Sequence, residues 1–183
     1  GLGGDFEMYL NPNLTGITHP ASTETFSNYS VIACDLTGNH DISMLTGLGG
    51  DFTVGANSNL TSITFPNNSL TFTDFSLQDN NLIGNLDLSM LSGLGGGFNC
   101  VQNPNLTGVT HAYTPNVFND YRAQSCDLTG NHDMSMLPGL GGDFEIYNNP
   151  LLTSITHTAS TEEILRYKVT NNNITGHHNL PFT

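Results

Sequence analysis

Residues 47–66 read GLGGDFTVGANSNLTSITFP and residues 1–20 read GLGGDFEMYLNPNLTGITHP, so nearly the same stretch occurs twice. Aligning the GLGG motif places further copies at Gly93 and Gly139, with a period of 46 residues and no insertions. A fixed period of this length is typical of a solenoid, in which each repeat buries the face of its neighbour. We therefore predict a single domain of four double repeats, which span residues 1–46, 47–92, 93–138 and 139–183.

Each double repeat divides into two coils of 23 residues that share two apolar positions and one polar position. In the third coil these positions are Phe52, Val54 and Asn57. Apolar residues two apart predict a strand with one buried face. The polar position recurs in all eight coils, as Asn11, Cys34, Asn57, Asn80, Asn103, Cys126, Asn149 and Asn172.

We interpret this polar column as a structural ladder. Where each coil leaves its strand, inward-facing backbone groups lose their partners, and a buried unpaired group costs about 1–3 kcal/mol. An asparagine amide both donates and accepts hydrogen bonds, and a cysteine thiol is a small, weak donor. Cys34 and Cys126 lie four coils apart, about 19 Å at the usual strand spacing, which is too far for a disulfide. These two cysteines and the inward-facing Cys100 are predicted to be buried free thiols.

The segments FSLQDNNLIGNLDLSML (75–91) and FNCVQNPNLTGVT (98–110) resemble leucine-rich repeats, in particular the short repeats of bacterial secreted and cell-surface proteins. Phe, Tyr and Val replace many of the leucines, and GLGG is an unusual turn. The resemblance covers all eight coils. It implies a repeat solenoid that is mainly β, a right-handed leucine-rich repeat coil of eight 23-residue turns with one parallel β-sheet and little or no helix. It also implies a secreted or cell-surface location and a role in binding or adhesion.

The amino-acid composition excludes two classes of binding partner. Three Lys and Arg residues against sixteen Asp and Glu give a formal net charge of -13. Such a surface repels phosphate backbones and anionic lipids, so we expect no nucleic acid partner. The sequence has no apolar run long enough to span a bilayer, so we expect no membrane insertion. Because the first residue lies inside a repeat, we also expect the chain to be an excerpt of a longer protein.

Alternate positions of each strand predict an exposed, acidic sheet face. Asp51 and Asp74 occupy equivalent positions of adjacent coils, where like charges repel. One interpretation is a solvated face that keeps the protein soluble, and the other is a site for a cation, hydroxyl groups or positive charge. We expect no cofactor, and binding of a cation such as calcium to this face stays an open alternative. The predicted binding face comprises Asp5, Glu7, Tyr9, Asp51, Asp74, Asp120, Arg122, Asp143, Glu145 and Tyr147.

Histidines recur at equivalent points of most coils, at His19, His40, His111, His132, His157 and His178. Because Phe65 and Leu86 occupy these points in the second double repeat, we expect the column to pack rather than to bind metal. Only the C-terminal group of His132, His157, His177 and His178 is dense enough to bind a metal, and His132, His157 and His178 are the weak candidates. The GNHD segments place Asp41 and Asp133 beside histidines, but no positioned nucleophile accompanies them. We therefore do not expect an enzyme.

Three functions stay open. The first is a ligand-binding or adhesion module that acts on a protein or carbohydrate through the sheet face. The second is binding to ice or another crystalline surface, and the third is a structural spacer. The ice hypothesis depends on threonines in register at Thr15, Thr61, Thr107 and Thr153, and at Thr18, Thr64, Thr110 and Thr156. The simplest interpretation places these threonines in the turn after the strand. End-to-end or sheet-face self-association also stays open.

Overall fold

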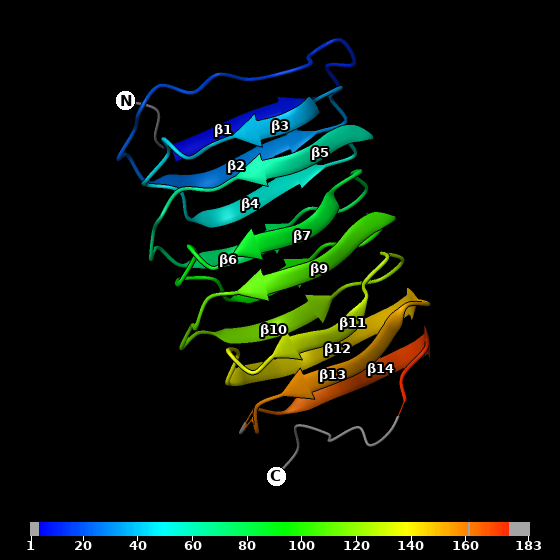
Figure 1. Ribbon diagram of the computed structural model, residues 1–183. Coiled ribbons are helices and arrows are strands. Elements are labelled where there is room, and N and C mark those ends of the chain that lie inside the picture. The colour runs from blue at the N-terminus through cyan, green and yellow to red at the C-terminus, as the bar shows by residue number, and fades with distance from the viewer. Residues whose placement is uncertain (1–3, 161, 176–183) are drawn as a thin grey trace.

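The computed structural model describes residues 4–160 and 162–175, which form a flattened parallel β-solenoid (Figure 1). Its main sheet has eight strands, one from each coil, and they lie in the order in which the coils follow along the chain. The predicted solenoid of 23-residue turns with one parallel sheet is confirmed, and no helix occurs within the described ranges. The strands of this sheet are β1 (Gly4–Tyr9), β2 (Phe26–Ile32), β4 (Gly50–Gly55), β6 (Phe72–Ser76), β8 (Gly96–Asn99), β10 (Val117–Arg122), β12 (Gly139–Asn149) and β14 (Ile164–Asn172).

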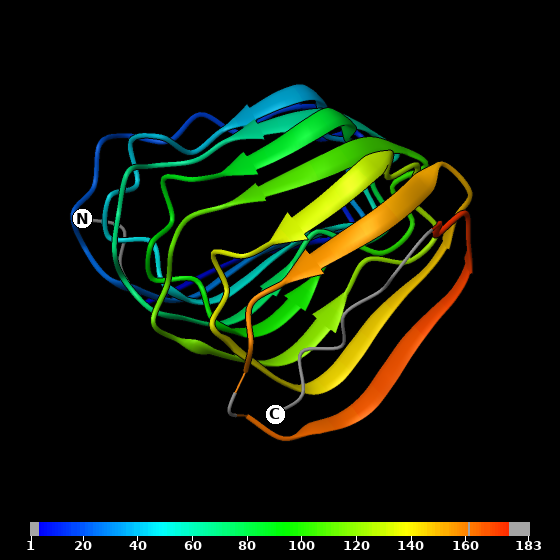
Figure 2. The ribbon, with the colours of Figure 1, turned by 60° about the horizontal axis from the view of Figure 1, so that its bottom comes forward.

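A second layer of short strands lies on the opposite side of the coil (Figure 2). They pair in parallel as three separate two-stranded ladders, β3 with β5, β7 with β9, and β11 with β13. The expectation of one strand per coil was therefore incomplete. In segments such as LTSIT a register shift separates the apolar Leu60 and Ile63 by three residues, so the period of two that marks a strand is broken. These strands are β3 (Thr37–Asp41), β5 (Asn59–Thr64), β7 (Ile83–Leu88), β9 (Asn105–His111), β11 (Gly130–Met134) and β13 (Leu152–His157).

Between the two layers runs a continuous ladder of aromatic rings, one from each coil. Each ring stacks on the next, with ring centroids 4.7 to 6.0 Å apart. The six inner rings are fully buried or nearly so. Stacked aromatic pairs contribute about 0.5–1.5 kcal/mol beyond the area they bury. The members are Phe6, Tyr29, Phe52, Phe75, Phe98, Tyr121, Phe144 and Tyr167.

The GLGG motif forms the tight bend that leads into the main-sheet strand. Its last glycine has a positive φ, 67° at Gly96 and 59° at Gly142. A Cβ at Gly96 would lie 2.1 Å from the carbonyl oxygen of Thr73, so no larger residue fits without movement of the backbone. The repeated glycines are therefore explained by close approach of neighbouring coils and by left-handed backbone.

A second bend lies at or just after the C-terminal end of each main-sheet strand, and one residue there adopts a left-handed conformation in all eight coils. The φ values lie between 52° and 58° at positions spaced 23 residues apart. None of these residues is glycine, although asparagine and aspartate, which tolerate this conformation, occupy three positions. The column consists of Leu10, Ala33, Ala56, Asp79, Gln102, Ser125, Asn148 and Asn171.

Candidate binding face and its buried supports

The polar column lies directly after these left-handed residues and links each coil to its neighbours. The Asn80 Nδ2 donates to the carbonyl oxygens of Val54, at 2.7 Å, and Leu77, at 2.9 Å. The Asn80 Oδ1 accepts from the backbone N–H of Asn57 at 3.0 Å. One buried amide therefore satisfies three backbone groups of two adjacent coils. The other members with comparable contacts to a preceding coil are Asn57, Asn103, Asn149 and Asn172.

Two cysteines occupy the same column and make weaker contacts. The Cys126 Sγ lies 3.2 Å from the carbonyl oxygen of Cys100, and the Cys34 Sγ lies 3.9 Å from that of Met8. Cys34, Cys100 and Cys126 are all buried free thiols, as the spacing predicted. The contact with Cys126, reinforced by burial, raises the pKa of the Cys100 thiol well above its ordinary value. This thiol is therefore protonated and unreactive at neutral pH.

The histidine column forms buried hydrogen-bonded groups with tyrosine. In the first double repeat the Tyr29 hydroxyl lies 2.8 Å from the Nε2 atoms of both His19 and His40. A hydroxyl carries one proton, so it donates to one imidazole and accepts from the other. Burial lowers the pKa of His19, and burial lowers the pKa of His40 to about 4. We call this group the first polar triad.

The third double repeat contains an equivalent group, here called the third polar triad. The Tyr121 hydroxyl lies 2.9 Å from the Nε2 of His111 and 2.8 Å from the Nε2 of His132. Burial lowers the pKa of His111 to about 3 and that of His132 to about 4. Both imidazoles are therefore neutral at pH 7.

The fourth double repeat contains a related pair, since the His157 Nε2 lies 2.8 Å from the Tyr167 hydroxyl. His178, the third weak metal candidate, lies outside the described residues. Over residues 4–160 and 162–175, no group of three or more His, Cys, Asp or Glu side chains is arranged to hold a metal ion. The imidazole Nε2 atoms of His132 and His157 point to tyrosine hydroxyls instead.

The aspartates of the GNHD segments have a structural role. The Asp41 Oδ1 accepts from the backbone N–H of Ser43 at 3.0 Å, and the Asp133 Oδ1 accepts from that of Ser135 at 2.9 Å. These hydrogen bonds to serine lower the pKa of both aspartates. The Asp–x–Ser spacing therefore closes a turn, and the same contact occurs at Asp87.

Two like charges of the main sheet, Asp51 and Asp74, are paired in register across β4 and β6. Burial, and then the neighbouring Asp51, raise the pKa of Asp74. The Thr73 hydroxyl donates to a carboxylate oxygen of Asp51. No ion pair with either aspartate is present among the described residues.

Next to Asp74 the column of side chains is interrupted by a glycine. A Cβ at Gly97 would lie 2.3 Å from the Asp74 Oδ1, so the carboxylate occupies the space above Gly97. On the far side, Asp120 has its Oδ1 buried without a hydrogen-bond partner in the described part of the chain. Burial also raises the pKa of Asp120, and Arg122 opposes this effect. We call the region around Asp74, Gly97 and Asp120 the acidic notch.

The remaining charges of the predicted face are largely compensated. The Arg122 Nη2 lies 2.9 Å from the Asp120 Oδ2 and 3.9 Å from the Asp143 Oδ2. The Lys168 Nζ lies 3.6 Å from the centroid of the Tyr147 ring, so a cation already covers one face of this ring. These contacts remove Asp143 and Tyr147 from the freely available part of the face.

Glu145 was predicted to be exposed, and this prediction was wrong. Only 5% of the Glu145 surface is exposed. The Arg166 Nη1 lies 2.8 Å from the Glu145 Oε1, and the Gln124 Nε2 donates to the Oε2 at 2.8 Å. The position does face outward, but long side chains of the two neighbouring coils cover it. Strand alternation cannot reveal such coverage.

Three further members of the predicted face lie on β1, at one end of the sheet and apart from the acidic notch. Asp5, Glu7 and Tyr9 are exposed. The Asn28 Nδ2 donates to the Glu7 Oε1 at 2.5 Å. The predicted face therefore contains three groups: the exposed acids of β1, the acidic notch with Asp51, and a compensated cluster around Arg122.

The threonines were expected in turns, and this placement was wrong for six of the eight, since only Thr15 and Thr18 lie outside a strand. Thr61 and Thr64 lie within β5, and their counterparts lie within β9 and β13 of the second layer. The Thr61 hydroxyl donates to the Gly38 carbonyl at 3.1 Å, and the Thr64 Oγ1 accepts from the Asn39 Nδ2 at 3.0 Å. These hydroxyls therefore form an ordered array that is already bonded within the protein.

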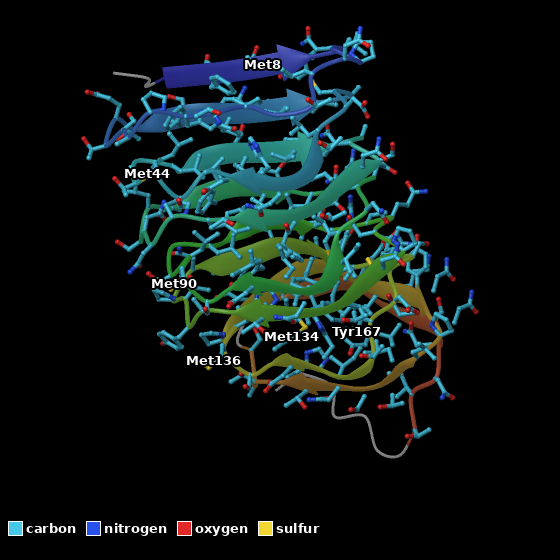
Figure 3. The ribbon with its side chains drawn as sticks, turned by 45° about the horizontal axis from the view of Figure 1, so that its top comes forward. Met8, Met44, Met90, Met134, Met136 and Tyr167 are labelled. Carbon is cyan, nitrogen blue, oxygen red and sulfur yellow. The ribbon has the colours of Figure 1, made fainter. Side chains whose placement is uncertain are left out.

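A column of exposed methionines was not predicted. Met44, Met90 and Met136 recur every 46 residues at one edge of the coil, and Figure 3 shows them along the same side. Each is between 43% and 53% exposed. Tyr113, 59% exposed, lies at the equivalent position of the intervening coil. The recurring triplet Ser–Met–Leu was the signal that could have identified this stripe.

The chain was compared with known proteins. No protein-family model, no curated protein and no solved structure matches it significantly. In the part of the chain that the structure describes, no helix is long and apolar enough to cross a membrane.

Proposed function

We propose that the protein is a non-enzymatic ligand-binding or adhesion module of the leucine-rich repeat type, which works at the cell surface or in secreted form. The acidic notch carries this proposal. There, Asp74 and Asp120 place carboxylates on either side of a glycine, and Arg122, which opposes the rise in the pKa of both groups, forms its ion pair with Asp120 rather than with Asp74. A ligand that supplies hydrogen-bond donors or positive charge relieves this unfavourable arrangement.

The chemistry of the notch favours a glycan, through its hydroxyl groups, or a basic segment of a protein. The exposed Asp74 carboxylate offers acceptors on one side of Gly97, and the half-buried Asp120 carboxylate lies on the other side. Asp51 extends the acceptor surface onto the neighbouring strand. Because the backbone of a parallel sheet is rigid, the acceptors are held at fixed spacing before the ligand arrives, which reduces the entropic cost of binding.

The test begins with a printed glycan array and a library of basic peptides, and the strongest hit supplies the probe. Binding of that probe to wild type is then compared with the double variant Asp74→Asn, Asp120→Asn by calorimetry. We expect at least about a tenfold loss of affinity, because charge-assisted hydrogen bonds become neutral ones. The matched control is Glu24→Gln, Asp127→Asn, which removes two charges outside the sheet.

Two outcomes contradict this proposal. Equal loss of affinity in the control pair would mean that net charge rather than the notch attracts the probe. A melting temperature that rises with calcium in wild type but not in the Asp74 and Asp120 double variant would identify the notch as a structural cation site.

Binding to ice or another crystalline surface is a second candidate, favoured by one observation. The threonines lie in register on three short strands of the second layer, which keeps their hydroxyls at regular spacing. Shaped ice crystals in the presence of the protein, lost in Thr61→Lys, Thr107→Lys, would support this function. Unfaceted crystals with wild type would exclude it.

A further inference from the structure

The three cysteines of the chain occupy two kinds of position in the coil. Cys34 and Cys126 belong to the polar column, whereas Cys100 faces the core three residues before Asn103. From the second coil on, each member of the polar column contacts the carbonyl oxygen of the residue 26 positions earlier, in the preceding coil. For Cys34 that earlier residue is Met8, and for Cys126 it is Cys100. Among these seven steps of the column, only the one from Cys100 to Cys126 brings two cysteines together.

The two thiols reach toward each other from adjacent coils. The Cys126 Sγ lies 3.2 Å from the Cys100 carbonyl oxygen, and the Cys100 Sγ lies 3.7 Å from the carbonyl oxygen of Arg122. The side chains of Cys100 and Cys126 also share a hydrogen bond, so no other group separates the two sulfur atoms. Asn99 and Arg122 are paired in register across β8 and β10, which fixes the two coils at the spacing of neighbouring strands. Side chains that point toward each other across adjacent strands meet the main geometric requirement for a disulfide.

Exposure differs between the two thiols and determines the order of reaction. Cys100 is fully buried, whereas 5% of Cys126 is exposed. A reagent in solution therefore meets Cys126 first. Cys100, which does not react by itself, becomes reactive once a modified Cys126 is held in contact with it, because proximity raises the effective concentration of the two groups.

We propose that Cys100 and Cys126 form an oxidative cross-linking site, at which a small-molecule disulfide converts the two thiols into one bond between the fifth and sixth coils. The Cys126 Sγ loses its proton and attacks one sulfur of the oxidant, so that the other sulfur leaves as a thiolate and takes up a proton. The Cys100 Sγ then attacks the Cys126 Sγ and breaks the bond to the oxidant, whose second thiolate receives the proton of Cys100. The two cysteines are oxidised by two electrons, and the oxidant is reduced to two thiols.

The bond would fasten one step of the stack. Each coil of a solenoid is stabilised mainly by its neighbours, so a covalent link between adjacent coils opposes their separation. It also closes a loop over residues 101–125, which restricts the unfolded chain and favours the folded one. Both sulfur atoms lie in the interior, so this site is independent of the sheet-face ligand proposed above.

The test counts free thiols in the 183-residue chain. The protein is refolded from urea in buffers of reduced or oxidised glutathione, so that burial of the thiols does not block the reagent. It is then alkylated with N-ethylmaleimide in denaturant and weighed by mass spectrometry. Wild type should carry three alkyl groups from the reduced buffer and one from the oxidised buffer, with Cys100 and Cys126 joined in one peptide pair. The urea midpoint of the oxidised protein should be higher than that of the reduced protein.

Two variants give the polar column the residue that it has in the other coils. Cys126→Asn should carry two alkyl groups from either buffer and show no shift in midpoint on oxidation, because the cross-linking partner is absent. Cys34→Asn is the matched control and should still lose two thiols, because Cys34 lies against Met8 rather than a cysteine.

Three results would overturn the proposal. The first is three free thiols in oxidised wild type, and the second is a glutathione adduct on Cys126 that leaves Cys100 free. The third is a midpoint that stays equal or falls on oxidation, because the folded coils would then not accommodate the bond.

Discussion

The second double repeat, residues 47–92, solves the same packing problem as the first and third with different chemistry. At the positions of the two polar triads it carries Phe65, Phe75 and Leu86, and no histidine occurs in it. The Phe75 ring still stacks in the aromatic ladder, at 5.0 Å from Phe52. Both solutions fill the same space beneath the same sheet.

The comparison teaches that these positions change as a set. In the aromatic ladder, Tyr29 and Tyr121 occur where two histidines contact the ring's hydroxyl. Where both histidines are absent, the equivalent residue is phenylalanine, Phe75. A buried hydroxyl or imidazole without a partner costs more than a single hydrogen bond contributes. A half-polar triad is therefore worse than either complete version.

Acid should expose the largest difference between the two kinds of repeat. His40, His111 and His132 have folded-state pKa values of about 4, 3 and 4, below the ordinary value of 6.5. At these histidines the unfolded chain therefore binds more protons than the folded chain below about pH 6.5, and their contribution to stability falls as pH decreases from there to about pH 3. Each histidine contributes up to about 1.4 kcal/mol per pH unit in this window.

Urea midpoints measured between about pH 7.5 and about pH 5 check this expectation. The lowered pKa values of Asp41 and Asp133 act only near and below the ordinary aspartate range. The raised pKa values of Asp74 and Asp120 add stability as the pH falls, so the measurement is made in the Asp74→Asn, Asp120→Asn variant, which removes this opposing effect. A midpoint that stays constant down to pH 5 would contradict the assignment of the buried histidines as neutral groups.

Removal of one hydroxyl from a polar triad is the next largest effect. Tyr121→Phe leaves the Nε2 atoms of His111 and His132 without their partner, at about 1–3 kcal/mol for each unsatisfied group. We expect unfolding free energy to fall by about 2–5 kcal/mol in urea denaturation at pH 7.5. The opposite result, a variant as stable as wild type, would mean that the hydroxyl is dispensable.

Substitution in the polar column of the second double repeat should have a smaller effect on the free energy of unfolding. This repeat has Asn80 where the first and third have Cys34 and Cys126, so it depends more on amide hydrogen bonds. Asn80→Ala should lower stability by about 1–3 kcal/mol, since three backbone contacts are lost. Asn67→Ala, at an exposed residue of the same repeat, is the control. Equal denaturation midpoints for the two variants would disprove the role of the ladder.

The smallest expected change in stability comes from replacement of a left-handed residue by glycine. Comparison of two such positions separates backbone strain from side-chain chemistry. Ala56 has a φ of 53°, which a residue with a Cβ adopts at a cost of about 1–2 kcal/mol. Ala56→Gly should raise the melting temperature slightly, because relief of strain exceeds the added flexibility of the unfolded chain. At Asn148, where φ is 57°, asparagine already tolerates the conformation, so Asn148→Gly should give no gain. Equal gains at both positions would contradict this distinction.

The strict period made the fold predictable, because a 23-residue step without insertions places equivalent residues in one column and so determines strand register. The same step identified Asn80 and its equivalents from the chain alone. The histidine column was expected to pack, but its tyrosine partners were not foreseen. His19, Tyr29 and His40 are spaced by 10 and 11 residues, and their contact depends on how the two layers face each other.

Other features depend on contacts that one-dimensional patterns do not contain. Glu145 is covered by Arg166 and Gln124 from the two neighbouring coils, so its buried state follows from side-chain reach rather than alternation. The left-handed bend occurs at residues as different as Leu10 and Asp79, so residue type does not indicate it. The threonine strands were missed because a register shift in each of them breaks the alternation of apolar and polar residues.

The central claim is that a polar triad is stable only as a complete set, and a replacement of the whole set tests it most directly. The variant His111→Phe, Tyr121→Phe, His132→Leu gives the third double repeat the residues of the second. We predict an unfolding free energy within about 1.5 kcal/mol of wild type at pH 7.5, well above that of Tyr121→Phe alone, and a weaker loss of stability in acid. A triple variant no more stable than Tyr121→Phe, measured by urea denaturation under the same conditions, would contradict the claim.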